Sequence, residues 1–279
     1  MKILSWNCGG WSCGGFNINK YKEIMCFQPE IILIQECTKN EFDYISMVTS
    51  EERTKLLPFL VDFKYPLEDE LKIKNFKYDN SKLQHWYGDD VEESYKGTAI
   101  FSTTCNYNIE LVDNFNKEFR YVIPYRIYFV APLIRMDEII LLSIWTKLPS
   151  DGSWNYQKTI FDALDYYNFN EAVILVGDFN TGSNKNNKHR YEELKTKLNK
   201  YNLKNCAENS EFEYEPTFFH DKTNDYFTND FCFIPKYYDV NKFYIDKMNN
   251  QKRWRNLSDH CPLIADFEQK DVIEALDYL

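Results

Sequence analysis

The chain has 279 residues, of which 44% are hydrophobic and 17% aromatic, so it can bury a substantial core. Its formal net charge of −10 at pH 7 argues against a surface that coats nucleic acid by bulk electrostatic attraction, since that affinity comes mainly from Lys and Arg. The argument against long duplex DNA is a mild one, because a bound divalent cation would invert the potential around a site.

The predicted secondary structure alternates between strands and helices. Strands, seen as short runs rich in Ile, Val, Phe and Leu, are expected at 2–6, 31–35, 98–102, 126–131, 139–145, 173–177, 231–234 and 263–267. Helices are expected at 18–27, 155–167 and 190–201, with a partly helical segment at 41–60, a polar loop at 182–189 and a short helix at 271–279. This alternation predicts an α/β protein. Because no internal repeat or long linker occurs, we expect a single domain over residues 1–270, followed by a short terminal helix or tail over residues 271–279.

The cysteine pattern and the lack of long apolar runs indicate in which cellular compartment the protein is expected. There are eight cysteines, but no two of them form a CxxC pair, so a structural zinc site has no support. The N-terminus lacks a basic region followed by an apolar signal segment, so we expect reduced thiols in a cytoplasmic protein. No apolar run approaches the roughly 18–20 residues that a membrane span needs.

Short polar motifs lie next to the apolar runs from one end of the chain to the other. They are Ser-Trp-Asn at 5–7, Gln-Glu at 35–36, Gly-Asp-Phe-Asn at 177–180, Asn-Asp at 229–230 and Ser-Asp-His at 258–260. Each is expected at a strand end or in the loop just beyond it. We therefore expect carboxylates, carboxamides and one imidazole, delivered by separate strands, to meet at one edge of a sheet.

These residue types suit hydrolysis at phosphorus, which needs a divalent cation, an activated water and donors to the phosphate oxygens. Glu36 and Asp259 supply hard oxygen ligands for Mg²⁺ or Mn²⁺. Asp178 can accept a proton from the attacking water, while Asn180 holds that water or a phosphate oxygen. A cationic His260 can donate to a non-bridging oxygen.

Two further residues are expected to support this set. Asp230 is the candidate carboxylate that keeps His260 cationic. Asn7, at the end of the first predicted strand, can orient Glu36 or contact the metal-bound water. Taken singly, each motif is more often an ordinary turn, cap or solvated strand end than a catalytic site. Their joint order favours the catalytic interpretation.

That order resembles the endonuclease/exonuclease/phosphatase superfamily, which includes deoxyribonuclease I-like and exonuclease III-like enzymes. The resemblance covers about residues 1–268, and the segment 96–102 (Lys-Gly-Thr-Ala-Ile-Phe-Ser) adds to it. It implies an α/β fold (α+β in some schemes): a four-layer α/β/β/α sandwich of two packed, mostly antiparallel sheets flanked by helices. It also implies one or two Mg²⁺ or Mn²⁺ ions. The implied site residues are Asn7, Glu36, Asp178, Asn180, Asp230, Asp259 and His260.

Two positions depart from the nuclease members of that superfamily. Where many of them carry a His or Tyr at the end of the strand before Gly-Asp-x-Asn, this chain has Trp145 or Thr146. An indole can donate one hydrogen bond or stack on a base, but it cannot transfer a proton. We expect Trp145 at the edge of the site, in contact with substrate. Asn229 lies where apurinic endonucleases often carry an Arg-x-Asp pattern, and this departure weakens the case for an abasic-site repair enzyme.

Three functions remain open from the sequence. The first is a metal-dependent nuclease that cleaves DNA or RNA by in-line attack of an Asp-activated water, favoured by the order of the motifs and the clustered aromatics. The second is a phosphatase or phosphodiesterase acting on a nucleotide, an inositol phosphate or a lipid head group, favoured by the acidic charge. The third is a binding protein that keeps the fold without catalysis. The sequence does not predict an oligomeric state.

Overall fold

The computed structural model describes residues 1–9, 15–47, 84–88, 96–104, 106–129, 138–147, 156–184, 188–246, 254 and 256–269. The expected helix at 271–279 and the second part of the segment 41–60 lie outside these ranges. Residues 39–47 are helical. Within the described ranges, no helix is long and apolar enough to cross a bilayer.

The first sheet has six strands in the order β12-β13-β1-β2-β4-β3. Their bounds are Tyr238–Ile245 for β12, Leu263–Gln269 for β13, Lys2–Asn7 for β1, Ile31–Thr38 for β2, Lys96–Ser102 for β4 and Gln84–Gly88 for β3. The pairing of β1 with β2 is parallel and the other pairings are antiparallel. The first and the last of the described strands, β1 and β13, thus lie side by side at the centre of this sheet.

The second sheet has seven strands, with β10-β11-β8-β7-β6-β5 in order and β9 paired to β11. Their bounds are Phe218–His220 for β10, Asp225–Pro235 for β11, Ala172–Ser183 for β8, Glu138–Trp145 for β7, Val122–Phe129 for β6, Tyr107–Leu111 for β5 and Leu203–Asn205 for β9. Only β7 and β8 pair in parallel among these described strands.

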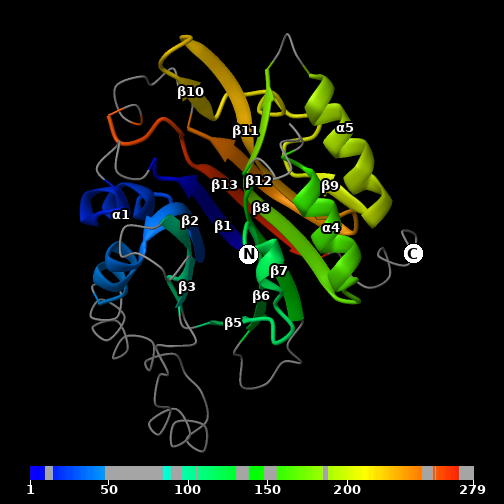
Figure 1. Ribbon diagram of the computed structural model, residues 1–279, viewed down its shortest axis with the longest axis horizontal. Helices are drawn as coiled ribbons and strands as arrows, with labels where there is room; N and C mark the ends of the chain where they lie inside the picture. The colour runs from blue at the N-terminus through cyan, green and yellow to red at the C-terminus, as the bar shows by residue number, and fades with distance from the viewer. Residues whose placement is uncertain are drawn as a thin grey trace, which may run out of the picture.

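The two sheets pack against each other, and helices cover their outer faces (Figure 1). The side chains of β7 alternate between these two layers. Leu141 joins the core between the two sheets, while Ile140 and Leu142 face the helices. These helices are α4 (Lys158–Tyr167) and α5 (His189–Leu198). Helix α1 (Ile18–Met25) lies on the opposite side (Figure 1). Single-turn 3₁₀ helices occupy Lys117–Phe119 and Asn199–Tyr201.

The expected strands and the helices at 18–27, 155–167 and 190–201 are confirmed, although residues 130–131 and 155 lie outside the described residues. Most ends agree within a few residues, but β8 extends six residues beyond its expected end and β11 begins six residues before its expected start. The expectation that each motif sits at a strand end is wrong for two of them. Gly-Asp-Phe-Asn lies inside β8, which continues to Ser183 and shortens the expected polar loop, and Asn-Asp lies inside β11. The expectation of a single sheet edge is also wrong, because the motifs come from both sheets.

Candidate active site

Asn7 joins the two sheets at the candidate active site. Its Nδ2 donates to Oδ2 of Asp178 at 3.0 Å, from β1 of the first sheet to β8 of the second. The same nitrogen lies 3.3 Å from Oε1 of Glu36 on the neighbouring strand β2. Its Oδ1 accepts from the backbone N–H of Gly9 at 3.0 Å, which fixes the orientation of the amide. Asn7 therefore holds two carboxylates from different sheets in place.

Glu36 projects from a β-bulge. The register of β2 against β4 shifts between Gln35 and Cys37, and Glu36 has φ +61°, a conformation that is uncommon for a residue other than glycine. Bulges of this kind re-aim a side chain, and backbone strain of this kind concentrates at functional sites. The carboxylate of Glu36 forms an ion pair with the ammonium group of Lys96, which begins β4.

The Gly-Asp-Phe-Asn segment distorts β8 in a way that its glycine permits. Gly177 has φ +140°, and a Cβ there would lie 2.0 Å from the backbone oxygen of Ile144, so only glycine fits. Asn180 has φ +48°, and this turns its amide back toward Asp178. Its backbone N–H donates to Oδ1 of Asp178 at 2.9 Å and its Nδ2 to Oδ2 at 3.0 Å. The carboxylate of Asp178 thus accepts three hydrogen bonds, counting Asn7.

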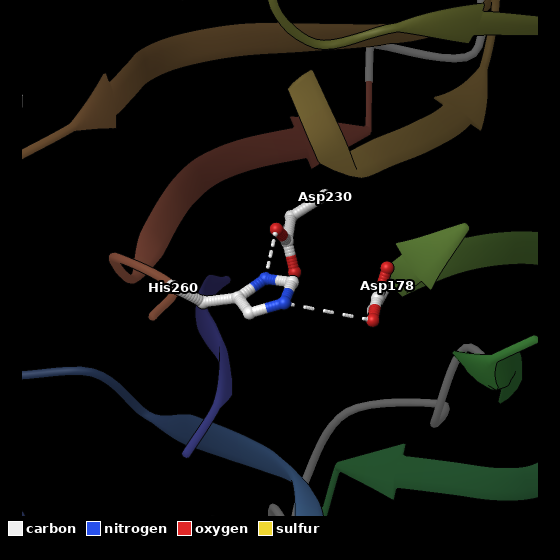
Figure 2. Close-up of side chains that lie close together, drawn as sticks. All are labelled: Asp178, Asp230 and His260. Atoms are coloured by element: carbon white, nitrogen blue, oxygen red, sulfur yellow. Dashed lines mark hydrogen bonds and ion pairs between the residues drawn. The ribbon is translucent and has the colours of Figure 1, made fainter. Parts of the chain in front are cut away.

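His260 lies between two buried carboxylates, as Figure 2 shows. Its Nδ1 is 2.8 Å from Oδ2 of Asp230, and its Nε2 is 3.9 Å from Oδ2 of Asp178. The shorter distance is a hydrogen bond and the longer one is not. All three residues are at most 4% exposed. The imidazole is therefore oriented by Asp230, and its second nitrogen faces Oδ2 of Asp178.

Residues that the sequence did not single out hold this imidazole in position. The indole Nε1 of Trp6 donates to the backbone oxygen of His260 at 2.9 Å. Ser258 accepts from the His260 backbone N–H at 3.1 Å and donates to the backbone oxygen of Asn7 at 2.8 Å. Trp6 and Ser258 belong to the Ser-Trp-Asn and Ser-Asp-His motifs, and this membership is the sequence signal that could have indicated their role. Thr217 accepts from the backbone N–H of Asp230 at 3.0 Å, and nothing in its own segment marks it.

The surroundings of Asp178 and His260 shift the pKa of both groups. Burial raises the pKa of Asp178 to about 7, although the charge of His260 and the hydrogen bonds from Asn180 and Asn7 oppose this rise. Burial alone would lower the pKa of His260, but the charges of Asp230 and Asp178 outweigh it and raise that pKa to about 10. At neutral pH the imidazole is therefore cationic, and Asp178 binds a proton much more readily than an exposed aspartate does.

Two predicted site residues lie beside this cluster. Asp259 is half-buried, and among the described residues its carboxylate is joined to Ser258, at 3.3 Å, and not to Glu36. Trp145 ends β7 and pairs in register with Asp178, which places it at the edge of the site. Its side chain is only 5% exposed, and Nζ of Lys147 lies 4.0 Å from the centre of its ring. The ring therefore offers little free face for stacking.

Glu36 fits a hard divalent cation. Its oxygens are the ligands that Mg²⁺ and Mn²⁺ prefer, and the ammonium group of Lys96 already places positive charge against them. Asp178, Asp230 and His260 also offer ligand atoms within 4.8 Å of one another. We do not assign a metal to that trio, because the imidazole Nδ1 is taken up by its hydrogen bond with Asp230 and the imidazole is cationic at neutral pH.

No family model and no curated protein matches the sequence. The structure is similar to an endonuclease/exonuclease/phosphatase family protein from Leptotrichia buccalis C-1013-b, with a TM-score of 0.56 and 16% identity over 96% of this chain and 99% of that chain.

Two further solved structures resemble the chain. D. rerio TDP2 complexed with single strand DNA product has a TM-score of 0.60 and 14% identity, over 96% of this chain and 99% of that chain. The catalytic domain of Xenopus laevis APE2 has a TM-score of 0.57 and 14% identity, over 97% of this chain and 92% of that chain. These likenesses, together with two packed sheets flanked by helices, confirm the expected architecture: the chain has the deoxyribonuclease I-like fold of endonuclease/exonuclease/phosphatase structures.

Proposed function

We propose that this chain is a divalent-metal-dependent phosphodiester hydrolase of the endonuclease/exonuclease/phosphatase superfamily, and specifically a nuclease. The observation that carries the proposal is the buried arrangement of Asp178 opposite the His260–Asp230 pair. It combines, in one place, a carboxylate with a pKa of about 7 and an imidazolium with a pKa of about 10. Two groups with such different affinities for a proton suit the roles of base and cationic donor.

Asp178 is the proposed general base. A pKa raised to about 7 suits a base that works at neutral pH, since the carboxylate then combines an accessible ionised form with a high affinity for the proton. Water attacks phosphorus, one of its protons passes to Asp178, and the bond from phosphorus to the leaving oxygen breaks. Asn180 and Asn7 fix the carboxylate through 3.0 Å hydrogen bonds, and Asn180 also positions the water or a phosphate oxygen.

His260 is the proposed electrostatic stabiliser. Its Nε2 faces Asp178, and in the proposed scheme it donates to a non-bridging phosphate oxygen as negative charge develops there. Asp230 keeps the ring cationic and fixes its orientation. Trp145 cannot protonate the leaving oxygen, so that oxygen takes its proton from solvent. In this scheme Trp145 forms part of the wall against which the substrate lies.

The proposed metal site is built on Glu36, with Asp259 and Asn7 as the other candidate ligands. A bound Mg²⁺ or Mn²⁺ would neutralise charge on the phosphoryl group and on the leaving oxygen. Asn7 contributes chiefly by orienting Glu36, because its amide nitrogen faces the carboxylate and its oxygen faces Gly9. One or two ions are proposed.

The proposed substrate is a nucleic acid. D. rerio TDP2, which has the same fold, is described with a single strand DNA product, and this supports the proposal. The alternative is a small phosphorylated molecule, favoured by the net charge of −10. A catalytically inactive binding protein is the second alternative. We propose a cytoplasmic protein and leave its oligomeric state open.

Hydrolysis of a substrate panel separates these functions. Purified protein is incubated with Mg²⁺, with Mn²⁺ and with EDTA on single-stranded DNA, duplex DNA, RNA, bis(p-nitrophenyl) phosphate and an inositol phosphate. We expect cleavage of a nucleic acid that requires the metal. Cleavage of the inositol phosphate alone would favour the small-molecule alternative. A complete lack of metal-dependent turnover on every substrate would favour the inactive binding protein.

A further inference from the structure

A cavity lies next to the candidate active site, between the end of the β3–β4 hairpin and the ends of β6 and β7. Its walls include Tyr87 of β3, Lys96 of β4, Arg120 and Tyr121 just before β6, and Trp145 at the end of β7. Two of these five residues are cations and three are aromatic.

The aromatic rings hold cations beside the cavity. The guanidinium of Arg120 lies 5.1 Å from the centre of the Tyr121 ring. Nζ of Lys147 lies 4.0 Å from the centre of the Trp145 ring and 5.4 Å from that of Tyr121. The rings of Tyr121 and Trp145 are perpendicular, with centres 6.1 Å apart. Cation–π contacts of this kind restrict long side chains, so less entropy is lost when these cations meet an anion.

Residues of the cavity wall are direct neighbours of the candidate catalytic residues. Trp145 pairs with Asp178 across β7 and β8, and the backbone N–H of Thr146 donates to the Asp178 backbone oxygen at 3.0 Å. The side chain of Asn180 donates to the Thr146 backbone oxygen at 2.8 Å. On the other side, Lys96 of the cavity wall pairs with Glu36. An anion in the cavity would therefore be a neighbour of a phosphate held between Asp178 and His260.

We propose that the open mouth of this small cavity, where the exposed side chains of Arg120 and Lys147 lie, is a second phosphate site, which binds the backbone of a nucleic acid strand next to the bond that is cleaved. This inference rests on the proposed function and narrows its substrate class. A strand carries phosphates at regular intervals, so a second cationic site beside the first is what its recognition requires. Arginine suits a phosphate because its planar fork donates two parallel hydrogen bonds.

The binding of a short strand, measured without turnover, tests this site. Fluorescently labelled hexathymidylate is titrated with the full chain in EDTA, by anisotropy, over a series of NaCl concentrations. Arg120→Gln and Lys147→Gln each remove one cation at an exposed side chain. Lys117→Gln is the matched control, because Lys117 is also exposed, lies three residues before Arg120 and is not part of the cavity wall.

We expect Arg120→Gln to weaken binding about tenfold at low salt and to reduce the slope of log affinity against log salt by about 0.7, the value for one phosphate contact on a single strand. Lys147→Gln should act in the same direction, and Lys117→Gln should change neither quantity. Unchanged affinity and slope in Arg120→Gln would overturn the inference, as would a lack of hexathymidylate binding by the unaltered chain. Tighter binding of a nucleoside 3′,5′-bisphosphate than of the strand would assign the cavity to a small molecule instead.

The readout distinguishes this inference from the proposed function. Cleavage of nucleic acid by the unaltered chain, combined with no effect of Arg120→Gln, would contradict the second phosphate site but support the proposed hydrolase activity. Binding that depends on Arg120, combined with no cleavage of any substrate in Mg²⁺ or Mn²⁺, would contradict the proposed hydrolase activity but support the strand-binding site.

Discussion

The imidazole of His260 forms a 2.8 Å hydrogen bond with the carboxylate of Asp230, which belongs to the other sheet. The bond is buried, and the charge of Asp230 is the largest of the influences that raise the pKa of His260. It links the segment before β13 to the middle of β11, so the packing of the two sheets determines the charge of the imidazole.

Asp230→Asn should lower the pKa of His260 from about 10 toward or below its ordinary value of 6.5, because burial then acts with less opposition. An NMR titration of the imidazole nitrogens measures this directly and needs no substrate. Asp225→Asn, at the exposed start of the same strand, is the control and should leave the titration unchanged. An unaltered His260 titration in Asp230→Asn would show that Asp230 does not set the charge of the ring.

The pH dependence of kcat/KM should be bell-shaped. Asp178 must be ionised to accept a proton, so the rate should fall as the pH drops below about 7. His260 must be cationic to stabilise the phosphate, so the rate should fall as the pH rises above about 10. In Asp230→Asn the alkaline limb should move toward neutral pH. A rate that keeps rising through pH 11 would contradict the role of His260.

Asp178→Asn should reduce kcat by about two to four orders of magnitude, the loss expected for a missing general base. The same change should leave the melting temperature at pH 8 unchanged or higher. The raised pKa of Asp178 shows that burial disfavours its charge, so above about pH 7 the ionised carboxylate costs stability that the neutral amide does not. A large loss of stability would instead make Asp178 a structural residue, and differential scanning calorimetry beside the kinetics separates the two outcomes.

Glu36→Gln should abolish the rise in melting temperature that Mg²⁺ or Mn²⁺ produces in the unaltered chain, because a ligand that binds the folded state stabilises it. The matched control is Glu118→Gln, an exposed glutamate in the 3₁₀ turn before β6. Thermal unfolding at increasing metal concentration gives the result without any substrate. Equal metal-induced stabilisation in Glu36→Gln would place the ion elsewhere.

Gly177→Ala should lower the free energy of unfolding by at least about 2 kcal/mol, since it combines a strained φ with a clash against the Ile144 backbone oxygen. Gly182→Ala is the matched control, because Gly182 also has a positive φ, +61°, but a Cβ there would meet only the Arg190 side chain at 3.6 Å. Its cost should be about 1–2 kcal/mol. Urea unfolding of both variants measures the difference, and equal costs would show that the close approach to β7 is not what requires glycine.

Much of the architecture could be predicted from the sequence because its central strands are unbroken apolar runs. Strands such as β1, β2 and β7 are buried on both faces, and their composition reflects it. Other strands were missed. β9 and β10 have only three residues each, and the edge strand β12 mixes buried and exposed positions. Their formation depends on pairing with a neighbour, which local composition does not encode.

The candidate site was predictable to the level of its motifs. Asn7, Glu36, Asp178 and His260 are brought close together, as expected, because their motifs flank or interrupt strands. The β-bulge that directs Glu36 could not be predicted, since it arises from the register of β2 against β4. The cavity likewise could not be predicted from the sequence, because its walls come from four strands or from the segments just before them.

Incorporation of ¹⁸O from labelled water into the product phosphate tests the central claim most directly. The nucleic acid that the protein cleaves is hydrolysed under single-turnover conditions with Mg²⁺, with the unaltered chain and with Asp178→Asn. Attack of water on phosphorus predicts one ¹⁸O atom in each new terminal phosphate, formed at a rate that falls at least about a hundredfold in Asp178→Asn. Product phosphate without ¹⁸O, or an equal rate in Asp178→Asn, would contradict hydrolysis by a water that Asp178 activates.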